Sequence, residues 1–257
     1  QIGNTWTKTL TAINAIADVT GKAKDAQLKD KFYPAAWETC EVKGLSKVYS
    51  LPWYADARLL FYRKDIFKKL GLTPVNLDTW RSFEEACAAL SGYTDGGEPM
   101  GALGVGDLKD SGLVHEVAPW VWSAGGDFLS ANGTKARFQE KESFKGIKFY
   151  FDLMHKGYAP ITDRKVPGYP AKDFFIANKY SMVIISAVAA TNIPGFFERS
   201  SQDKNSGVID KFGVTFLPAG PGGRFSFLGG SNLAISNYSA HQEEAWQFLK
   251  YLTSKEF

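Results

Sequence analysis

The amino-acid sequence predicts an α/β fold. Short apolar segments of strand length alternate with amphipathic segments of helical spacing along the whole chain. This alternation is typical of α/β layering and not of a helical bundle or a β-sandwich. The chain has 257 residues, of which 44% are hydrophobic and 22% charged. It can therefore bury a sizeable core, as one large domain or as two of modest size.

The spacing of apolar residues gives the order of the expected elements. They are the end of a strand at 1–3, a helix at 7–19, a strand at 59–62, helices at 65–70 and 82–90, a strand at 102–105, helices at 113–123, 144–155 and 173–177, strands at 181–185 and 213–217, and a helix at 239–252. Gly21, Gly71 and Gly157 are expected to end helices. Residues 82–85 and 239–242 fit capping boxes that open two others. The apolar face of the helix at 144–155 is expected to consist of Phe144, Ile147, Phe151 and Met154.

Composition and charge argue against several classes of function. The net charge is +3 and the positive residues are scattered, so neither a nucleic acid nor an anionic membrane is an expected partner. The most apolar run, at 182–185, has the length of a buried strand and is far too short to span a membrane. No signal peptide opens the chain, and the strand end at 1–3 suggests that the sequence starts inside a fold.

The sequence contains no pattern typical of a metal or cofactor site. His115, His155 and His241 are far apart, and a bound metal is therefore not expected. A complete dinucleotide fingerprint, a P-loop and a nucleophile elbow are all missing, so the sequence predicts no cofactor and no catalytic residue. Of the two cysteines, Cys87 is expected to be a buried free thiol, while its pairing with Cys40 stays open.

Three carboxylates leave one enzymatic alternative open. Asp56, Glu116 and Asp127 lie in apolar or glycine-rich surroundings, and a glycosidase needs only two such groups. A binding protein also uses carboxylates, as charged acceptors for sugar hydroxyls. The sequence does not place any pair of them at a catalytic separation.

Five segments in a fixed order carry a family resemblance. They are GNTWT at 3–7, LPWYADARLLFYRKD at 51–65, WSAGGD at 122–127, FIANKYSM at 175–182, and LPAGP at 217–221 followed by FLGGSNLAI at 227–235. Together they resemble family 1 of the extracellular solute-binding proteins, the sugar-binding components of bacterial ABC importers. The resemblance covers essentially the whole chain.

The resemblance implies a two-lobed, type II periplasmic-binding-protein fold that is truncated at both ends. The amino-terminal lobe would contain residues 1–56 and 228–257, and the other lobe residues 57–227. Crossovers are expected near 56–59 and 225–228. The implied function is capture of a carbohydrate in an interlobe cleft by hinge closure, followed by delivery to the ABC permease. The protein would be a monomer in the periplasm or at the cell surface, where a lipid anchor is one option.

The same resemblance points to ligand-binding residues near the start of the chain. Asn4, Thr5 and Trp6 would lie at a lobe rim, where Trp6 could stack on a sugar ring and Asn4 could bind vicinal hydroxyls. The alternative is that Asn4 or Thr5 caps a helix. Asp56 is the leading polar site residue. Arg58 beside it either binds ligand or pairs with a carboxylate.

Further site residues follow from the later motifs. Of Trp120 and Trp122, one is expected to line the cleft and the other to belong to the core; Trp122 is the expected site residue. Gly229, Gly230 and Ser231 would bring backbone close to the ligand, because glycine permits close approach. Asn232 either binds ligand or orders this loop.

One departure from the family pattern concerns the ligand. Many members carry a ligand-stacking Trp after the strand at 181–186, whereas residues 187–192 of this chain contain no aromatic side chain. Another polar solute, such as a polyol or a glycerophosphodiester, is therefore an alternative to a carbohydrate. A glycosidase acting through Asp56 is the alternative from a different class.

Overall fold

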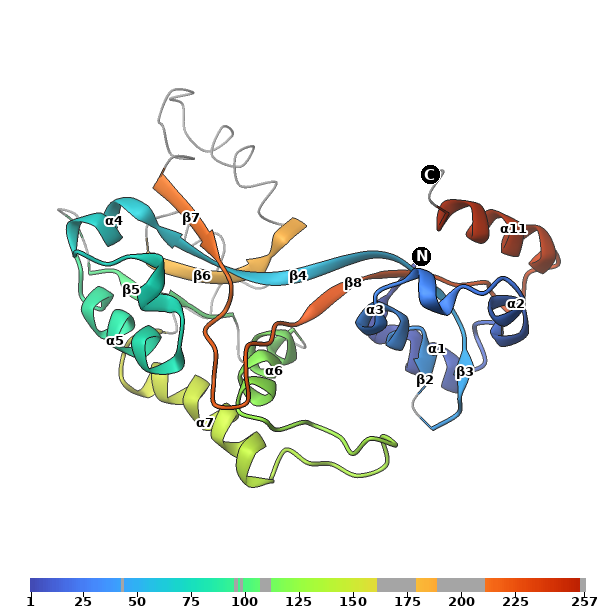
Figure 1. Ribbon diagram of the computed structural model, residues 1–257, viewed down its shortest axis with the longest axis horizontal. Coiled ribbons are helices and arrows are strands. Elements are labelled where there is room, and N and C mark those ends of the chain that lie inside the picture. The colour runs from blue at the N-terminus through green and yellow to red at the C-terminus, as the bar shows by residue number, and fades with distance from the viewer. Residues whose placement is uncertain are drawn as a thin grey trace. The chain divides into compact units, whose positions relative to one another are not determined.

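The computed structural model describes residues 1–42, 44–94, 97, 99–106, 112–160, 179–188 and 211–254. The chain divides into two compact units (Figure 1). Unit 1 comprises Gln1–Ala57, Ala131–Lys135 and Leu228–Phe257, and unit 2 comprises Arg58–Ser130 and Ala136–Phe227. The long strand β4 (Leu51–Arg63) contributes its first half to unit 1 and its second half to unit 2.

Unit 1 is built on three antiparallel strands in the order β1-β8-β4. Two of these strands are β1 (Ile2–Gly3) and β8 (Leu228–Leu233). The helices and the β-hairpin of this unit are, in chain order, a 3-10 turn (Asn4–Trp6), α1 (Thr7–Ala12), α2 (Thr20–Asp25), a 3-10 turn (Lys29–Lys31), α3 (Pro34–Glu38), β2 (Glu41–Val42) with β3 (Lys47–Val48), and α11 (Gln242–Leu252). Buried Trp37, Leu51, Leu233 and Trp246 belong to its core.

Unit 2 surrounds the second half of β4, which pairs antiparallel with both β6 and β7, while β5 runs parallel to β6. Its elements are α4 (Lys64–Lys69), a 3-10 turn (Pro74–Leu77), α5 (Trp80–Leu90), β5 (Gly101–Gly104), α6 (Leu113–Ser123), α7 (Lys141–His155), β6 (Tyr180–Ser186) and β7 (Phe212–Thr215). Leu60, Phe83, Trp120 and Met182 lie in one continuous core. This mixture of strands and helices confirms the expected α/β class.

The expected helix at 7–19 is wrong in its second half. α1 ends at Ala12 and Asn14 adopts a positive φ of 55°, which a helix cannot continue through. The Nδ2 atom of Asn237 donates to the carbonyl oxygens of Asn14 and Ile16 at 2.8 and 3.1 Å. This contact from a distant part of the chain stabilises an extended segment. Gly21 therefore does not end a helix but lies within α2.

Both expected capping boxes are misplaced. The box of α5 starts three residues earlier, with Thr79 Oγ1 accepting from the backbone N–H of Ser82. The N-cap of α11 is His241, whose own N–H donates to Ser239 Oγ at 3.1 Å. Gly71 and Gly157, in contrast, have positive φ angles just after α4 and α7, as expected for residues that end helices.

The buried face of α7 agrees with the expected one only in part. Ile147, Phe151 and Met154 are partly buried and pack against the core, whereas Phe144 is 57% exposed. The fully buried residues of the helix are Ser143, Gly146, Tyr150 and Leu153. α7 packs closely on α6 at Gly146, because a Cβ there would overlap the backbone of α6. The large side chain of Tyr150 also faces α6, where its hydroxyl donates to Glu116.

The remaining expectations from the sequence concern the two cysteines, the helix at 173–177 and a membrane span. Cys40 and Cys87 are both buried and free, which confirms the expected state of Cys87. The expected helix at 173–177 lies outside the described residues. None of the helices in the described part of the chain combines the length and the apolar composition that a membrane span requires.

Candidate functional site

One candidate binding face in unit 1 crosses its three strands. Ser231 of β8 lies opposite Gly3 of β1 on one side and opposite Tyr54 of β4 on the other. Directly opposed residues present their side chains on the same face of a sheet. Two residues further along β4, Asp56 lies opposite Gly229. Because side chains alternate along a strand, Asp56 shares the face of Tyr54.

Trp6 lies on this face and is 60% exposed. The 3-10 turn that carries it follows β1 directly, and its ring atoms lie 3.4 Å from the position that a Cβ on Gly3 would occupy. The indole therefore rests on the backbone of β1, with much of its surface open to solvent. Thr5 beside it is also exposed.

Asn4 holds the turn in place by donating from Nδ2 to the carbonyl oxygen of Leu228, at 3.0 Å. The capping positions of the turn and of α1 are Gly3 and Trp6. Neither Asn4 nor Thr5 therefore stands at a helix cap, which was the alternative interpretation of the sequence. The predicted role of Asn4 as a ligand-binding residue remains a prediction.

Ser231 is the polar centre of the face. Gln1 Nε2 donates to Ser231 Oγ at 2.9 Å, and Ser231 Oγ donates to the hydroxyl of Tyr54 at 3.2 Å. Gly230 beside it has a φ of 126°, and a Cβ there would overlap the carbonyl oxygen of Tyr54. Glycine at this position thus allows β8 to approach β4 closely. Ser231 and Asn232 are both buried, and Asn232 donates to Thr39, so it orders the core.

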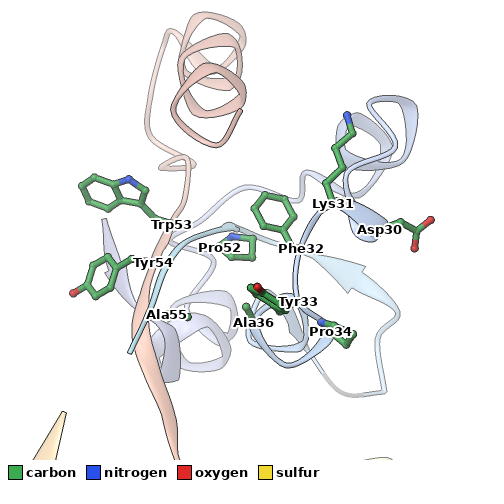
Figure 2. Close-up of a pocket in the computed structure, with 10 residues that line it drawn as sticks. All are labelled: Asp30, Lys31, Phe32, Tyr33, Pro34, Ala36, Pro52, Trp53, Tyr54 and Ala55. Carbon is green, nitrogen blue, oxygen red and sulfur yellow. The ribbon is translucent and has the colours of Figure 1, made fainter. Parts of the chain in front are cut away.

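An aromatic depression of about 570 Å³ adjoins this face within unit 1. Figure 2 shows Trp53 and Tyr54 on one side, Phe32 and Tyr33 on the other, and Pro52 between them. The strand pairing explains why Trp53 and Tyr54 both open onto it. The register of β4 against β8 shifts between Pro52 and Tyr54, so Trp53 is the extra residue of a β-bulge, and bulges re-aim side chains.

Unit 2 carries a second candidate face, formed by three aromatic rings. The Phe227 ring lies between those of His115 and Trp122, at centroid distances of 4.2 and 6.3 Å. Trp122 is partly buried and donates from Nε1 to Asp127 Oδ1 at 3.3 Å. Arg58 Nη2 lies 3.4 Å from His115 Nδ1. The structure therefore brings two predicted site residues, Arg58 and Trp122, into one cluster, whereas Trp120 belongs to the core.

Glu116 and Asp127, two carboxylates considered for catalysis, have clear hydrogen-bond partners. Glu116 accepts from the backbone N–H of Gly106 and, at 2.6 Å, from the hydroxyl of Tyr150. Burial raises the pKa of Tyr150 well above its usual value, and the neighbouring charge of Glu116 adds to this effect. Asp127 accepts from Trp122 and from the backbone of Phe128. Asp56 is partly buried.

Among the residues that the structure describes, no group of three His, Cys, Asp or Glu side chains could hold a metal ion. The sequence interpretation missed Tyr54, Phe32, Tyr33, His115 and Phe227. Tyr54 stands two residues before Asp56, so strand periodicity could have indicated it. The others come together only through tertiary contacts.

Comparison with known proteins agrees with this architecture. The family model of the bacterial extracellular solute-binding proteins matches residues 1–257. The mannitol-binding protein of Pseudomonas aeruginosa is 27% identical over 236 residues, which cover 89% of this chain and 50% of that protein. The arabinooligosaccharide-binding protein of Halalkalibacterium halodurans is 24% identical over 224 residues, or 86% of this chain and 46% of that protein.

A solved structure extends the comparison to the fold. An ABC transporter solute-binding protein from Thermotoga lettingae, bound with α-D-tagatose, superposes with a TM-score of 0.76 at 28% identity. The match covers 99% of this chain and 62% of that one. The chain thus spans less than two thirds of each of these proteins and has the α/β architecture of the two-lobed periplasmic binding proteins. By the match of the family model along its whole length, the chain belongs to the bacterial extracellular solute-binding proteins.

Proposed function

We propose that the protein captures a carbohydrate outside the cytoplasm and delivers it to the permease of an ABC importer. The observation that carries this proposal is Trp6, an indole held against the backbone of β1 and 60% exposed. The C–H face of a sugar ring packs on such a flat surface, and the apolar area removed from water contributes about 25 cal/mol per Å².

Polar groups beside Trp6 suit a hydroxyl-rich ligand. Ser231 and Tyr54 form a hydroxyl pair that can both donate and accept. Asp56 on the same face supplies a charged acceptor. In unit 2, the ring cluster of His115, Phe227 and Trp122 offers a further aromatic surface beside the guanidinium of Arg58. The relatives that bind arabinooligosaccharide, mannitol and tagatose support the same class of ligand.

The mechanism that we propose is binding followed by conformational change, without chemistry. Closure of the two lobes on the ligand, which the family resemblance predicts, requires only that the ligand contact the closed form more favourably than the open one. The glycosidase alternative is disfavoured because the matching family and the relatives are solute-binding proteins. We therefore expect no turnover of a chromogenic glycoside.

A sugar panel tests this proposal by isothermal titration calorimetry and thermal unfolding. A ligand present at 100 times its Kd should raise stability by about 2.7 kcal/mol. Trp6→Ala should weaken sugar binding at least about tenfold, equivalent to about 1.4 kcal/mol. Phe248→Ala removes a ring of similar exposure, 59%, from α11, and is the matched control. Equal affinities for the two variants would contradict the proposal.

A polyol is the second candidate ligand, favoured by the mannitol-binding relative. An acyclic polyol presents no flat C–H face for Trp6 to stack on, whereas its hydroxyls still suit Ser231, Tyr54 and Asp56. Loss of Trp6 should therefore weaken polyol binding much less than binding of a ring sugar. Mannitol binding that is retained in Trp6→Ala, with no ring sugar bound by the wild type, would favour the polyol.

A further inference from the structure

We propose that the aromatic depression between α3 and β4 is a second sugar subsite, which holds the outer rings of an oligosaccharide whose first ring lies on Trp6. The inference rests on the proposed function and deepens it, because it assigns the substrate to oligosaccharides and not to single sugars. The depression occupies about 570 Å³, within the range of roughly 300–1,000 Å³ that is typical of ligand pockets.

The far wall of the depression is held by rigid packing. Phe32 stacks on Trp37 with ring centroids 5.8 Å apart and an interplanar angle of 27°. Trp37 is buried and donates from Nε1 to Glu41 Oε1 at 2.6 Å. Pro34 occupies the first turn of α3, where its ring fixes the backbone. A wall formed in advance loses little conformational entropy when a ligand binds.

The near wall consists of two rings in different orientations. The centroids of Trp53 and Tyr54 lie 6.1 Å apart with an interplanar angle of 64°. Both side chains remain exposed, at 39% and 46%, although they belong to a paired strand. Rings that face different directions suit the successive rings of an oligosaccharide, whose flat faces turn from one unit to the next.

The polar groups of the depression fit a neutral, hydroxyl-rich ligand. Tyr33 and Tyr54 each contribute a hydroxyl that can donate and accept. Asp30 and Lys31 lie at the outer end, beyond Phe32 and Tyr33 in Figure 2. One acidic and one basic side chain cancel in net charge, so the rim does not select an ion, yet each can bind a sugar hydroxyl.

Tyr54 connects the depression to the Trp6 face. Its ring lines the depression, while its hydroxyl accepts a hydrogen bond from Ser231 on the face that carries Trp6. All of these residues belong to unit 1, so a chain of linked sugars can run from Trp6 across Tyr54 to Tyr33 along a single compact unit. Two aromatic surfaces on one unit suit a ligand of more than one sugar ring.

The experiment measures affinity as a function of ligand length. Calorimetric titrations would use arabinose, mannitol, and arabino- and malto-oligosaccharides of increasing length, against the wild type, Tyr33→Ala and Tyr238→Ala. Tyr33 is 81% exposed in the depression and Tyr238 is 83% exposed elsewhere in unit 1. The two substitutions are therefore matched in exposure, and neither removes a buried side chain.

The expected result is that wild-type affinity rises at least about tenfold from the shortest to the longer oligosaccharides of the series that binds. Tyr33→Ala should lose most of this gain while its affinity for the shortest sugar stays within twofold, and Tyr238→Ala should match the wild type. A gain that survives in Tyr33→Ala overturns the inference. If short sugars bind in a way that depends on Trp6 but affinity does not rise with ligand length, the inference of a second subsite is overturned and the proposed function stays intact. Failure to bind any sugar overturns both.

Discussion

Replacing Gly230 with alanine should damage the junction between β4 and β8. Gly230 has a φ of 126°, and its Cβ would overlap the carbonyl oxygen of Tyr54, well inside the 3.4 Å at which ordinary contacts begin. A strained backbone of this kind costs of order 1–3 kcal/mol. Loss of a neighbouring ladder hydrogen bond adds about 1 kcal/mol. We therefore expect destabilisation of about 2–4 kcal/mol.

Thermal unfolding followed by circular dichroism measures this effect. At roughly 2–4 °C per kcal/mol for a chain of this size, the Tm of Gly230→Ala should fall by about 5–15 °C. Gly21→Ala is the matched control, because Gly21 lies within α2 and a Cβ there meets nothing within 4 Å. Its Tm should rise slightly, since alanine favours a helix by about 1 kcal/mol. A Gly230→Ala protein as stable as the wild type would refute the reasoning.

Three further predictions concern unit 2. Burial, reinforced by the charge of Glu84, raises the pKa of the Cys87 thiol well above its usual value. A thiol reagent at pH 8 should therefore modify Cys87 only after denaturation. Rapid labelling of Cys87 in the native protein would contradict this. Burial alone would raise the pKa of Asp65, but its hydrogen bonds and the charge of Arg63 outweigh burial and lower that pKa. Asp65→Asn should therefore lose about 1–3 kcal/mol at pH 7. Urea titrations should show this deficit shrinking as the pH falls below about 4, where the carboxylate is protonated first in the unfolded chain and, at lower pH, in the native protein. A deficit independent of pH would exclude the ion pair as its cause. Gly146→Ala should push α7 away from the backbone of α6. The overpacking should cost about 1–3 kcal/mol and lower the Tm by several degrees or more. An unchanged Tm would show that the two helices can move apart without cost.

Local patterns in the sequence predicted the elements whose ends are determined locally. The helix at 113–123 has the predicted bounds, although Pro119 lies inside it. Gly71 ends α4 in the left-handed conformation that glycine favours. The helix at 7–19 failed for the opposite reason, because hydrogen bonds from Asn237 stabilise an extended segment after Asn14. A contact across more than two hundred residues leaves no trace in the local spacing of apolar residues.

The candidate site was predictable to a similar extent. The motifs that carry the family resemblance indicated both Trp6 at the strand-to-helix passage and close backbone approach at Gly230, and in the structure Trp6 is exposed and Gly230 lies close to β4. The neighbours of Arg58 were not predictable. His115 comes from α6 and Phe227 from the segment before β8, and only the tertiary fold places them beside the strand.

The β-bulge at Trp53 explains why Tyr54 has two roles. Before the bulge Pro52 pairs with Asn232, and after it Tyr54 pairs with Ser231. If the same sequence paired without the bulge, Trp53 would stand opposite Ser231 and every later side chain of this part of β4 would change face. Tyr54 and Asp56 would then point away from the face that carries Trp6. The same irregularity that opens the aromatic depression therefore also aligns the polar residues beside Trp6, and for this physical reason the two surfaces occur together.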